Sequence, residues 1–129
     1  MRQVTLMEKY PVFVLEVAKT ETSFTTVDEI VEYLRGCVDK EDKVAFIGVF
    51  DHYEHTRSIG GDIEARIQAA KNVVFCFGFA LPNPMVMAVR PRSIGVCDVG
   101  DGFVISFLEA PMPPANKAME EWAKGVRNL

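Results

Sequence analysis

The side chains with the most chemical potential lie in one short stretch, FDHYEHTRSIGG. Both histidines of the chain are here, three positions apart, and two carboxylates accompany them. The candidate metal ligands are Asp51, His52, Glu54 and His55. Zinc and similar ions need three or four imidazole, thiolate or carboxylate ligands. The spacing matches neither an H-E-x-x-H helix nor a paired-cysteine finger. We therefore favour a polar strand end or interface segment over a metal or catalytic site.

The local backbone decides whether the two histidines can act together. If the preceding strand continues as far as His55, alternate side chains point to opposite faces, and His52 and His55 are separated. If a helical turn follows Phe50, the two imidazoles lie on one side and can share a metal ion. The sequence leaves both alternatives open.

Three arginines beside turn-forming residues indicate a second kind of site, one for an anion. Arg57 lies in RSIGG, whereas Arg90 and Arg92 lie in VRPRSIG. Backbone amides exposed at glycine, together with a guanidinium, can hold a carboxylate or a phosphate. Neither stretch has the glycine spacing of a P-loop or of a dinucleotide fingerprint, and turn chemistry with surface ion pairs is the simpler interpretation. The residues that we name for ligand binding are His52, His55, Arg57, Arg90 and Arg92.

The cysteines are poor candidates for a nucleophile. They form no C-x-x-C pair, and Cys76 and Cys97 lie within apolar segments. A reactive thiolate needs a histidine base and an electropositive, accessible setting. We predict that Cys37, Cys76 and Cys97 are reduced, mostly buried thiols of a cytoplasmic protein.

Methionine and phenylalanine are abundant enough to line a pocket as well as a core. The segment LPNPMVMAV, with Met112 and Met119, supplies flexible thioethers that adapt to irregular shapes. The accompanying phenylalanines are Phe46, Phe50, Phe75, Phe77, Phe79, Phe103 and Phe107. We expect most of them in the core, with an apolar pocket for a small ligand as the alternative.

Helical periodicity predicts two amphipathic helices and one shorter helix. The first spans about 27–37, where Thr26 and Glu29 fit a capping box. Its apolar face comprises Val27, Ile30, Val31, Leu34 and Val38. The second follows PMPP, which prevents a strand from continuing. Its apolar face comprises Ala115, Ala118, Met119, Trp122 and Val126. The short helix follows Asp62, with Ile63, Ile67 and Ala70 on one side.

Apolar runs bounded by turn residues predict the strands. Residues 2–7 and 12–18 form one bent strand or a small hairpin, divided at Tyr10-Pro11. The runs KVAFIGVFD and NVVFCFGF are predicted to be central strands that lie side by side. The segment SIGVCDVGDGFVISFLEA is predicted to be a hairpin that turns at Gly100-Asp101-Gly102.

These elements predict an α+β fold. Strands joined by turns form a mainly antiparallel, curved sheet, and the two amphipathic helices cover one of its faces. The other face is left to solvent or to a partner. At 129 residues, we expect one domain over 1–129.

Composition excludes several classes of function. The formal net charge is −4 with the two signs interspersed, so no basic stripe exists for nucleic acid. No apolar run approaches the ~20 residues that a membrane helix needs, and the N-terminus lacks a signal-peptide pattern. We expect a soluble protein in the cytoplasm.

The segment NPMVMAVRPRSIGVCDVGDGFVISFLEAP, residues 83–111, resembles a small family of uncharacterised bacterial single-domain proteins, a domain of unknown function. In that family an asparagine-proline and a short helical segment lead into a hairpin that ends at a proline. The resemblance implies a TATA-binding-protein-like order of one strand, one helix, four strands and one helix. It covers the C-terminal third, and the FDHYEH segment has no counterpart in it. The family carries no established activity.

Two classes of function therefore remain. We favour a non-enzymatic binding or interaction domain without a cofactor, a homodimer that buries the open sheet face or an edge strand and holds a small apolar or anionic ligand. The alternative is an enzyme or divalent-metal protein with a site around Asp51, His52, Glu54 and His55, where Arg57 or Arg90 stabilises negative charge.

Overall fold

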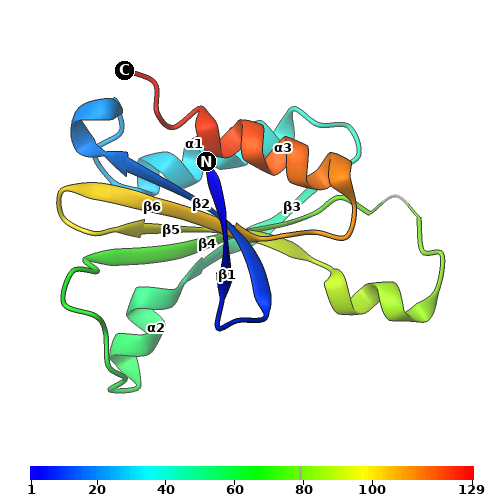
Figure 1. Cartoon of the computed structure of the whole chain (residues 1–129), viewed down its shortest axis with the longest axis horizontal. Helices are drawn as coiled ribbons and strands as arrows, with labels where there is room; N and C mark the ends of the chain where they lie inside the picture. Colours follow the sequence, from blue (N-terminus) through cyan, green and yellow to red (C-terminus); the bar gives the residue numbers. More distant parts are fainter. Residues whose placement is uncertain (79) are drawn as a thin grey trace.

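The chain folds as an open antiparallel sheet with helices on both sides (Figure 1). The structure is a computed structural model that describes residues 1–78 and 80–129. The sheet has six strands in the order β1-β2-β6-β5-β4-β3. The strands are β1 Arg2–Leu6, β2 Tyr10–Ala18, β3 Ala45–Asp51, β4 Ala69–Cys76, β5 Arg92–Asp98 and β6 Gly102–Leu108. The α-helices are α1 Val27–Asp39, α2 His52–Ser58 and α3 Pro113–Lys124, and the 3-10 helices are η1 Lys19–Glu21 and η2 Pro84–Val89.

The helices α1 and α3 cover one face of the sheet, as the sequence predicts (Figure 1). The hydroxyl of Thr26 caps α1 by accepting from the Glu29 N–H at 3.2 Å, and the carboxylate of Glu29 accepts from the Thr25 N–H at 3.0 Å. All five residues of the predicted α1 stripe are buried. The sheet contributes the rest of the core beneath the helices: Leu15, Val17, Val73, Phe75, Ile94, Val96, Phe103, Ile105 and Phe107. The α+β prediction is confirmed.

The N-terminal apolar segment is a hairpin rather than one bent strand. Strands β1 and β2 pair antiparallel, and Leu6 lies opposite Tyr10. The tight connection places Met7 and Glu8 at φ values of 54° and 62°. Residues other than glycine, asparagine and aspartate rarely adopt this region, so the sequence carries no conventional turn signal here. If this hairpin counts as the first strand and the short helices η1, α2 and η2 count as insertions, the order is the expected strand, helix, four strands and helix.

The short helix predicted behind Asp62 is wrong. Residues 61–68 form irregular backbone with a turn at 65–66, and Ala70 already belongs to β4. The Gln68 N–H donates to the carbonyl of Asp98 at 2.8 Å, which draws the segment into the sheet. Because a few apolar residues at helical spacing after Gly60-Gly61 cannot offset this pairing, the tertiary contact overrides the local pattern.

Strands β3 and β4 lie side by side, but only one of them is central. Their antiparallel register places Val49 opposite Val73 and Phe50 opposite Asn72. The prediction that both are central strands is wrong for β3, which forms an edge of the sheet. The β4 strand also starts three residues earlier than predicted, at Ala69, and ends at Cys76; the predicted end at Phe79 lies outside the described residues.

The predicted C-terminal hairpin is confirmed. Strands β5 and β6 pair antiparallel, with Asp98 opposite Phe103. Gly100 has a φ of +97°, a conformation that favours glycine. The Gly100 N–H donates to the carboxylate of Asp98 at 2.9 Å, which fixes the turn.

The second face of the sheet, which we call the open face, has no long helix over it. The central strands present mostly uncharged side chains here: Val14, Asn72, Val74, Gly95, Cys97, Val104 and Ser106. The charged Glu16 lies opposite Val104 on the same face. The helices α2 and η2 lie on this side, near opposite ends of the sheet (Figure 1). His52, His55 and Arg57 lie on α2, and Arg90 follows η2. Arg92 lies opposite the buried Phe75, so its side chain belongs to the covered face of the sheet.

Candidate functional site

Arg90 and Arg92 flank the junction between η2 and β5. The side chain of Asn83 caps η2 by accepting from the Val86 N–H at 3.1 Å, and Pro84 starts it. The helix ends before Arg90, and β5 begins at Arg92. The bond between Arg90 and Pro91 is cis. Arg90 therefore directly follows η2, and Arg92 is the first residue of β5.

The guanidinium of Arg90 lies against the backbone of Gly78. Its Nη1 donates to the carbonyl of Ala80 at 2.6 Å. A Cβ built on Gly78 would approach the guanidinium carbon of Arg90 to 2.7 Å, so any larger residue at this position would displace the cation. Gly78 thus supplies the space in which Arg90 sits.

Arg92 is half-buried and bonds to two carbonyls. Its Nη1 donates to Val89 at 3.1 Å and its Nη2 donates to Leu108 at 2.6 Å. Burial lowers the pKa of the guanidinium from its ordinary value. Arginine starts from so high a pKa that the group stays positive at neutral pH. The bonds tie the end of η2 to the end of β6.

Apolar side chains surround the two guanidinium groups in what we call the arginine cleft. Two adjoining hollows, of about 40 and 180 Å³, share Phe77, Gly78, Arg90 and Met112. The remaining wall residues are Ala80, Pro82, Val86, Val89, Arg92, Ala110, Pro111 and Ala115. Phe77 is fixed by stacking on Trp122, with ring centroids 5.7 Å apart. Because drug-sized pockets begin near ~300 Å³, this cleft suits only a small ligand.

Within the described part of the chain, neither Arg90 nor Arg92 lies within ion-pair distance of a carboxylate; their acceptors are the backbone carbonyls named above. A guanidinium has five N–H donors and no acceptor, so both groups retain hydrogen-bonding capacity. An anionic ligand can pair with such a positive charge and place its apolar part against the wall.

Arg57, by contrast, has its own partner. The Glu54 carboxylate accepts from its Nη2 at 2.8 Å and from its Nε at 3.1 Å. This bidentate pair raises the pKa of Arg57 above its ordinary value through the hydrogen bond to Glu54. The predicted ligand residue is therefore engaged within α2.

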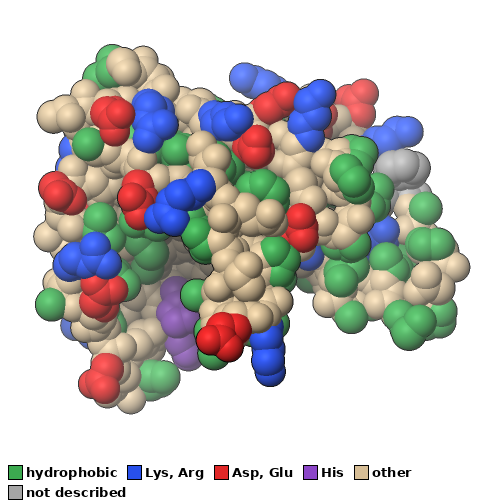
Figure 2. All heavy atoms as spheres, viewed as in Figure 1, with side chains coloured by type: hydrophobic (Ala, Val, Ile, Leu, Met, Phe, Trp, Pro, Cys, Tyr) green, Lys and Arg blue, Asp and Glu red, His purple; other side chains and the backbone are tan. Residues whose placement is uncertain are grey.

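The helical alternative for FDHYEHTR is the one that the chain adopts. The carboxylate of Asp51 caps α2 by accepting from the Glu54 N–H at 3.0 Å. His52 and His55 consequently lie on one side of the helix, with ring centroids 5.9 Å apart. The Phe50 ring lies 5.5 Å from each of them. Figure 2 shows histidine side chains, in purple, at the border of a hollow edged by hydrophobic groups.

The histidines lack a complete set of metal ligands from this chain. Among the described residues, no three side chains of His, Cys, Asp or Glu gather in a way that could hold a metal ion. Of the other predicted ligands, Asp51 caps the helix and Glu54 binds Arg57. A metal at His52 and His55 needs further ligands from outside the cluster.

The cysteines lie apart from any such chemistry. Cys37, Cys76 and Cys97 are free thiols and half-buried. Burial raises the pKa of Cys37 and of Cys97, which disfavours the thiolate form.

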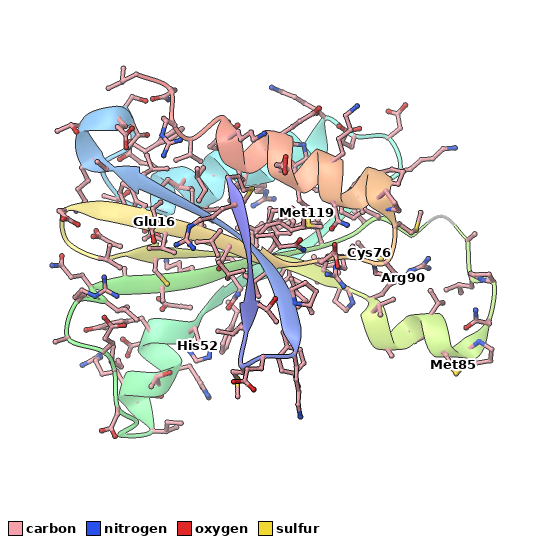
Figure 3. The ribbon with its side chains drawn as sticks, viewed as in Figure 1. Glu16, His52, Cys76, Met85, Arg90 and Met119 are labelled. Atoms are coloured by element: carbon pink, nitrogen blue, oxygen red, sulfur yellow. The ribbon has the colours of Figure 1, made fainter. Side chains whose placement is uncertain are left out.

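The predicted residues form two separate sites rather than one. In Figure 3, His52 projects from α2 beneath the sheet, whereas Arg90 lies at the other end, beside η2. Sequence reasoning missed the contributions of Gly78, Ala110, Pro111 and Ala115 to the arginine cleft. They come from segments far apart in the chain, and only the fold brings them to Arg90.

No helix within the described residues is both long and apolar enough to cross a membrane. No curated protein and no solved structure matches the chain. One family model does match, over residues 1–128, and its description is "Family of unknown function (DUF6858)". The resemblance is therefore not limited to the C-terminal third, and the matched range includes the FDHYEH segment. By this match over nearly its whole length, the chain belongs to the DUF6858 family of unknown function.

Proposed function

We propose that this protein is a binding protein for a small organic anion, and that the arginine cleft is its binding site. The ligand class is a carboxylate with a short apolar body. One observation carries the proposal: among the described residues, the two guanidinium groups at an otherwise apolar cleft bond to backbone carbonyls and not to carboxylates.

The cleft combines two positive charges with an apolar wall, and this combination supports the ligand class. The carboxylate would accept from the N–H groups of Arg90 and Arg92, since guanidinium and carboxylate geometries match. The apolar body would lie against Phe77, Val86 and Met112. With hollows of about 40 and 180 Å³, the ligand has about six to ten non-hydrogen atoms, fewer than a drug-sized molecule.

The arrangement favours binding over catalysis. Catalysis of the acid–base kind needs a titratable group within reach of the bound ligand. The cleft residues comprise two arginines and otherwise apolar or small side chains. Both histidines lie on α2, at the far end of the sheet from Arg90.

Titration of the whole protein with sodium hexanoate, followed by amide shifts in NMR spectra, tests the proposal. A ligand of this size gives a dissociation constant of about 0.1–1 mM at ordinary ligand efficiency. We expect hexanoate to bind more tightly than acetate, which lacks the apolar body, and than 1-hexanol, which lacks the charge. Equal affinity for hexanoate and 1-hexanol would contradict the role of the arginines.

Three matched variants sharpen the test. Arg90→Gln or Arg92→Gln should weaken hexanoate binding by about tenfold, the equivalent of one charge-assisted hydrogen bond. Arg57→Gln removes a guanidinium on α2, at the far end of the sheet from Arg90, and should leave the affinity unchanged. An equal loss in all three variants would show that hexanoate responds only to net charge.

A further inference from the structure

A second feature, the histidine pair on α2, is independent of the arginine cleft. We propose that His52 and His55 form half of a zinc site, which a second copy of this chain completes with the same two residues. The bridged dimer would hold one zinc ion between four imidazoles. The inference goes beyond the proposed function, because it assigns a metal and a partner to a different surface.

The two rings are placed almost as a shared metal ion requires. Zinc binds imidazole nitrogen at about 2.0–2.1 Å with tetrahedral angles, which places the centres of two bound rings about 5 Å apart. The observed separation is 5.9 Å. Rotation of two exposed side chains closes a gap of this size without moving the helix.

For His52, the contact with Thr56 occupies one ring nitrogen and leaves the other to face a metal ion. Nδ1 of His52 lies 2.9 Å from Oγ1 of Thr56. If Nδ1 carries the proton and donates to this hydroxyl, Nε2 keeps its lone pair for a metal, as in sites where a neighbouring group orients the ligand. The Phe50 ring lies 5.5 Å from both imidazoles, on the side of the helix that carries them.

The ligand count indicates the second copy. A structural zinc ion takes four protein ligands, whereas the described residues of one chain bring no three His, Cys, Asp or Glu side chains together around such a point. A twofold axis beside α2 would bring an identical pair to the same point, because a symmetric interface uses the same surface twice.

The surface of α2 permits such an approach. The helix has no fully buried residue, and His52 and His55 are both exposed. Its acidic and basic side chains, Glu54 and Arg57, neutralise each other within the helix. Two copies of α2 can therefore approach without a net repulsion between them.

The test is the mass of the protein with and without zinc. Protein stripped with EDTA is compared by sedimentation velocity before and after half an equivalent of zinc chloride, and calorimetry gives the stoichiometry. We expect a mass of one 14.4 kDa chain in EDTA, twice that mass with zinc, and one zinc ion for two chains.

Variants assign the effect to the pair. His52→Ala and His55→Ala should each abolish the zinc-dependent mass increase, while Ser58→Ala on the same helix should retain it. Thr56→Val should weaken zinc binding by about tenfold or more with an unchanged melting temperature, which separates orientation of His52 from folding.

Several results would overturn the inference. These are the absence of zinc binding, one zinc ion per chain without an increase in mass, a dimer that forms equally in EDTA, or zinc-dependent association that persists without both histidines. Loss of hexanoate binding alone leaves this inference standing, because it concerns the arginine cleft.

Discussion

Removal of the Trp122 side chain tests the packing that fixes the arginine cleft. The ring is 7% exposed, stacks on Phe77, and meets the edge of Phe75 at a centroid distance of 5.5 Å. Burial of roughly 200 Å² at about 25 cal/mol per Å² amounts to about 5 kcal/mol. A compact unfolded chain lowers this value, so we expect Trp122→Ala to reduce the free energy of unfolding by about 3–5 kcal/mol.

The assay is urea unfolding followed by far-ultraviolet circular dichroism, because the variant lacks the chain's single tryptophan and fluorescence would lose its probe. Glu121→Ala, an exposed neighbour on α3, is the control and should change the free energy by less than about 0.5 kcal/mol. A loss below about 1 kcal/mol for Trp122→Ala would refute the packing of α3 on the sheet. At temperatures where the variant is folded, its affinity for hexanoate should also fall, because Phe77 loses its stacking partner.

Three further predictions concern the α1 cap and the wall of the cleft. Thr26→Ala should lower the free energy of unfolding by about 1 kcal/mol, because the Glu29 N–H loses its acceptor; urea unfolding measures this, and an unchanged midpoint would contradict the cap. Hydrogen bonds from Thr25 lower the pKa of the Glu29 carboxyl in the folded chain. The unfolded chain therefore binds a proton at Glu29 more tightly than the folded chain does. The stabilisation by Glu29 is present above its ordinary pKa of 4.5 and is lost as the pH falls through the lower native pKa. Glu29→Gln should therefore reduce the acid-induced loss of stability in thermal melts below that pH, and identical pH profiles would contradict it. Gly78→Ala should displace the guanidinium of Arg90 and weaken hexanoate binding, while the free energy of unfolding changes by less than about 1 kcal/mol; unaltered affinity would show that the position of Arg90 is irrelevant.

The parts of the fold that sequence predicts well are those whose signals are local and repeated. The α1 stripe from Val27 to Val38 and its cap at Thr26 act within one helix, and the turn at Gly100 needs only neighbouring residues. The segment 62–70 shows the limit of such signals. It has a weak helical pattern, but its last residues, 68–70, instead pair with β5, a contact set by distant residues.

Helix α2 shows a signal that pattern reasoning undervalued. The helix buries none of its residues, and its sequence HYEHTRS accordingly has no apolar stripe. Hydrophobic periodicity therefore cannot detect this helix. The aspartate at position 51, with a glutamate three residues later, has the spacing of an N-cap. That spacing favours the helical alternative for His52 and His55, which the structure adopts.

The candidate sites also combine features that are local in the sequence with contacts between distant segments. Sequence selects Arg90 and Arg92 by residue type and by their place near a turn, but it does not show that Gly78 and Met112 lie beside them. Nor does it show that Arg57 is occupied by Glu54 while the other two arginines lack an acidic partner among the described residues. Such facts depend on contacts between segments, which only the folded chain defines.

The most direct measurement of the central claim is a side-chain NMR titration that follows the Nε–Hε signals of the arginines while sodium hexanoate is added. Binding in the arginine cleft predicts saturable shifts for Arg90 and Arg92, none for Arg57, and none for any arginine with 1-hexanol. Signals of Arg90 and Arg92 that stay unchanged at saturating hexanoate would contradict the account.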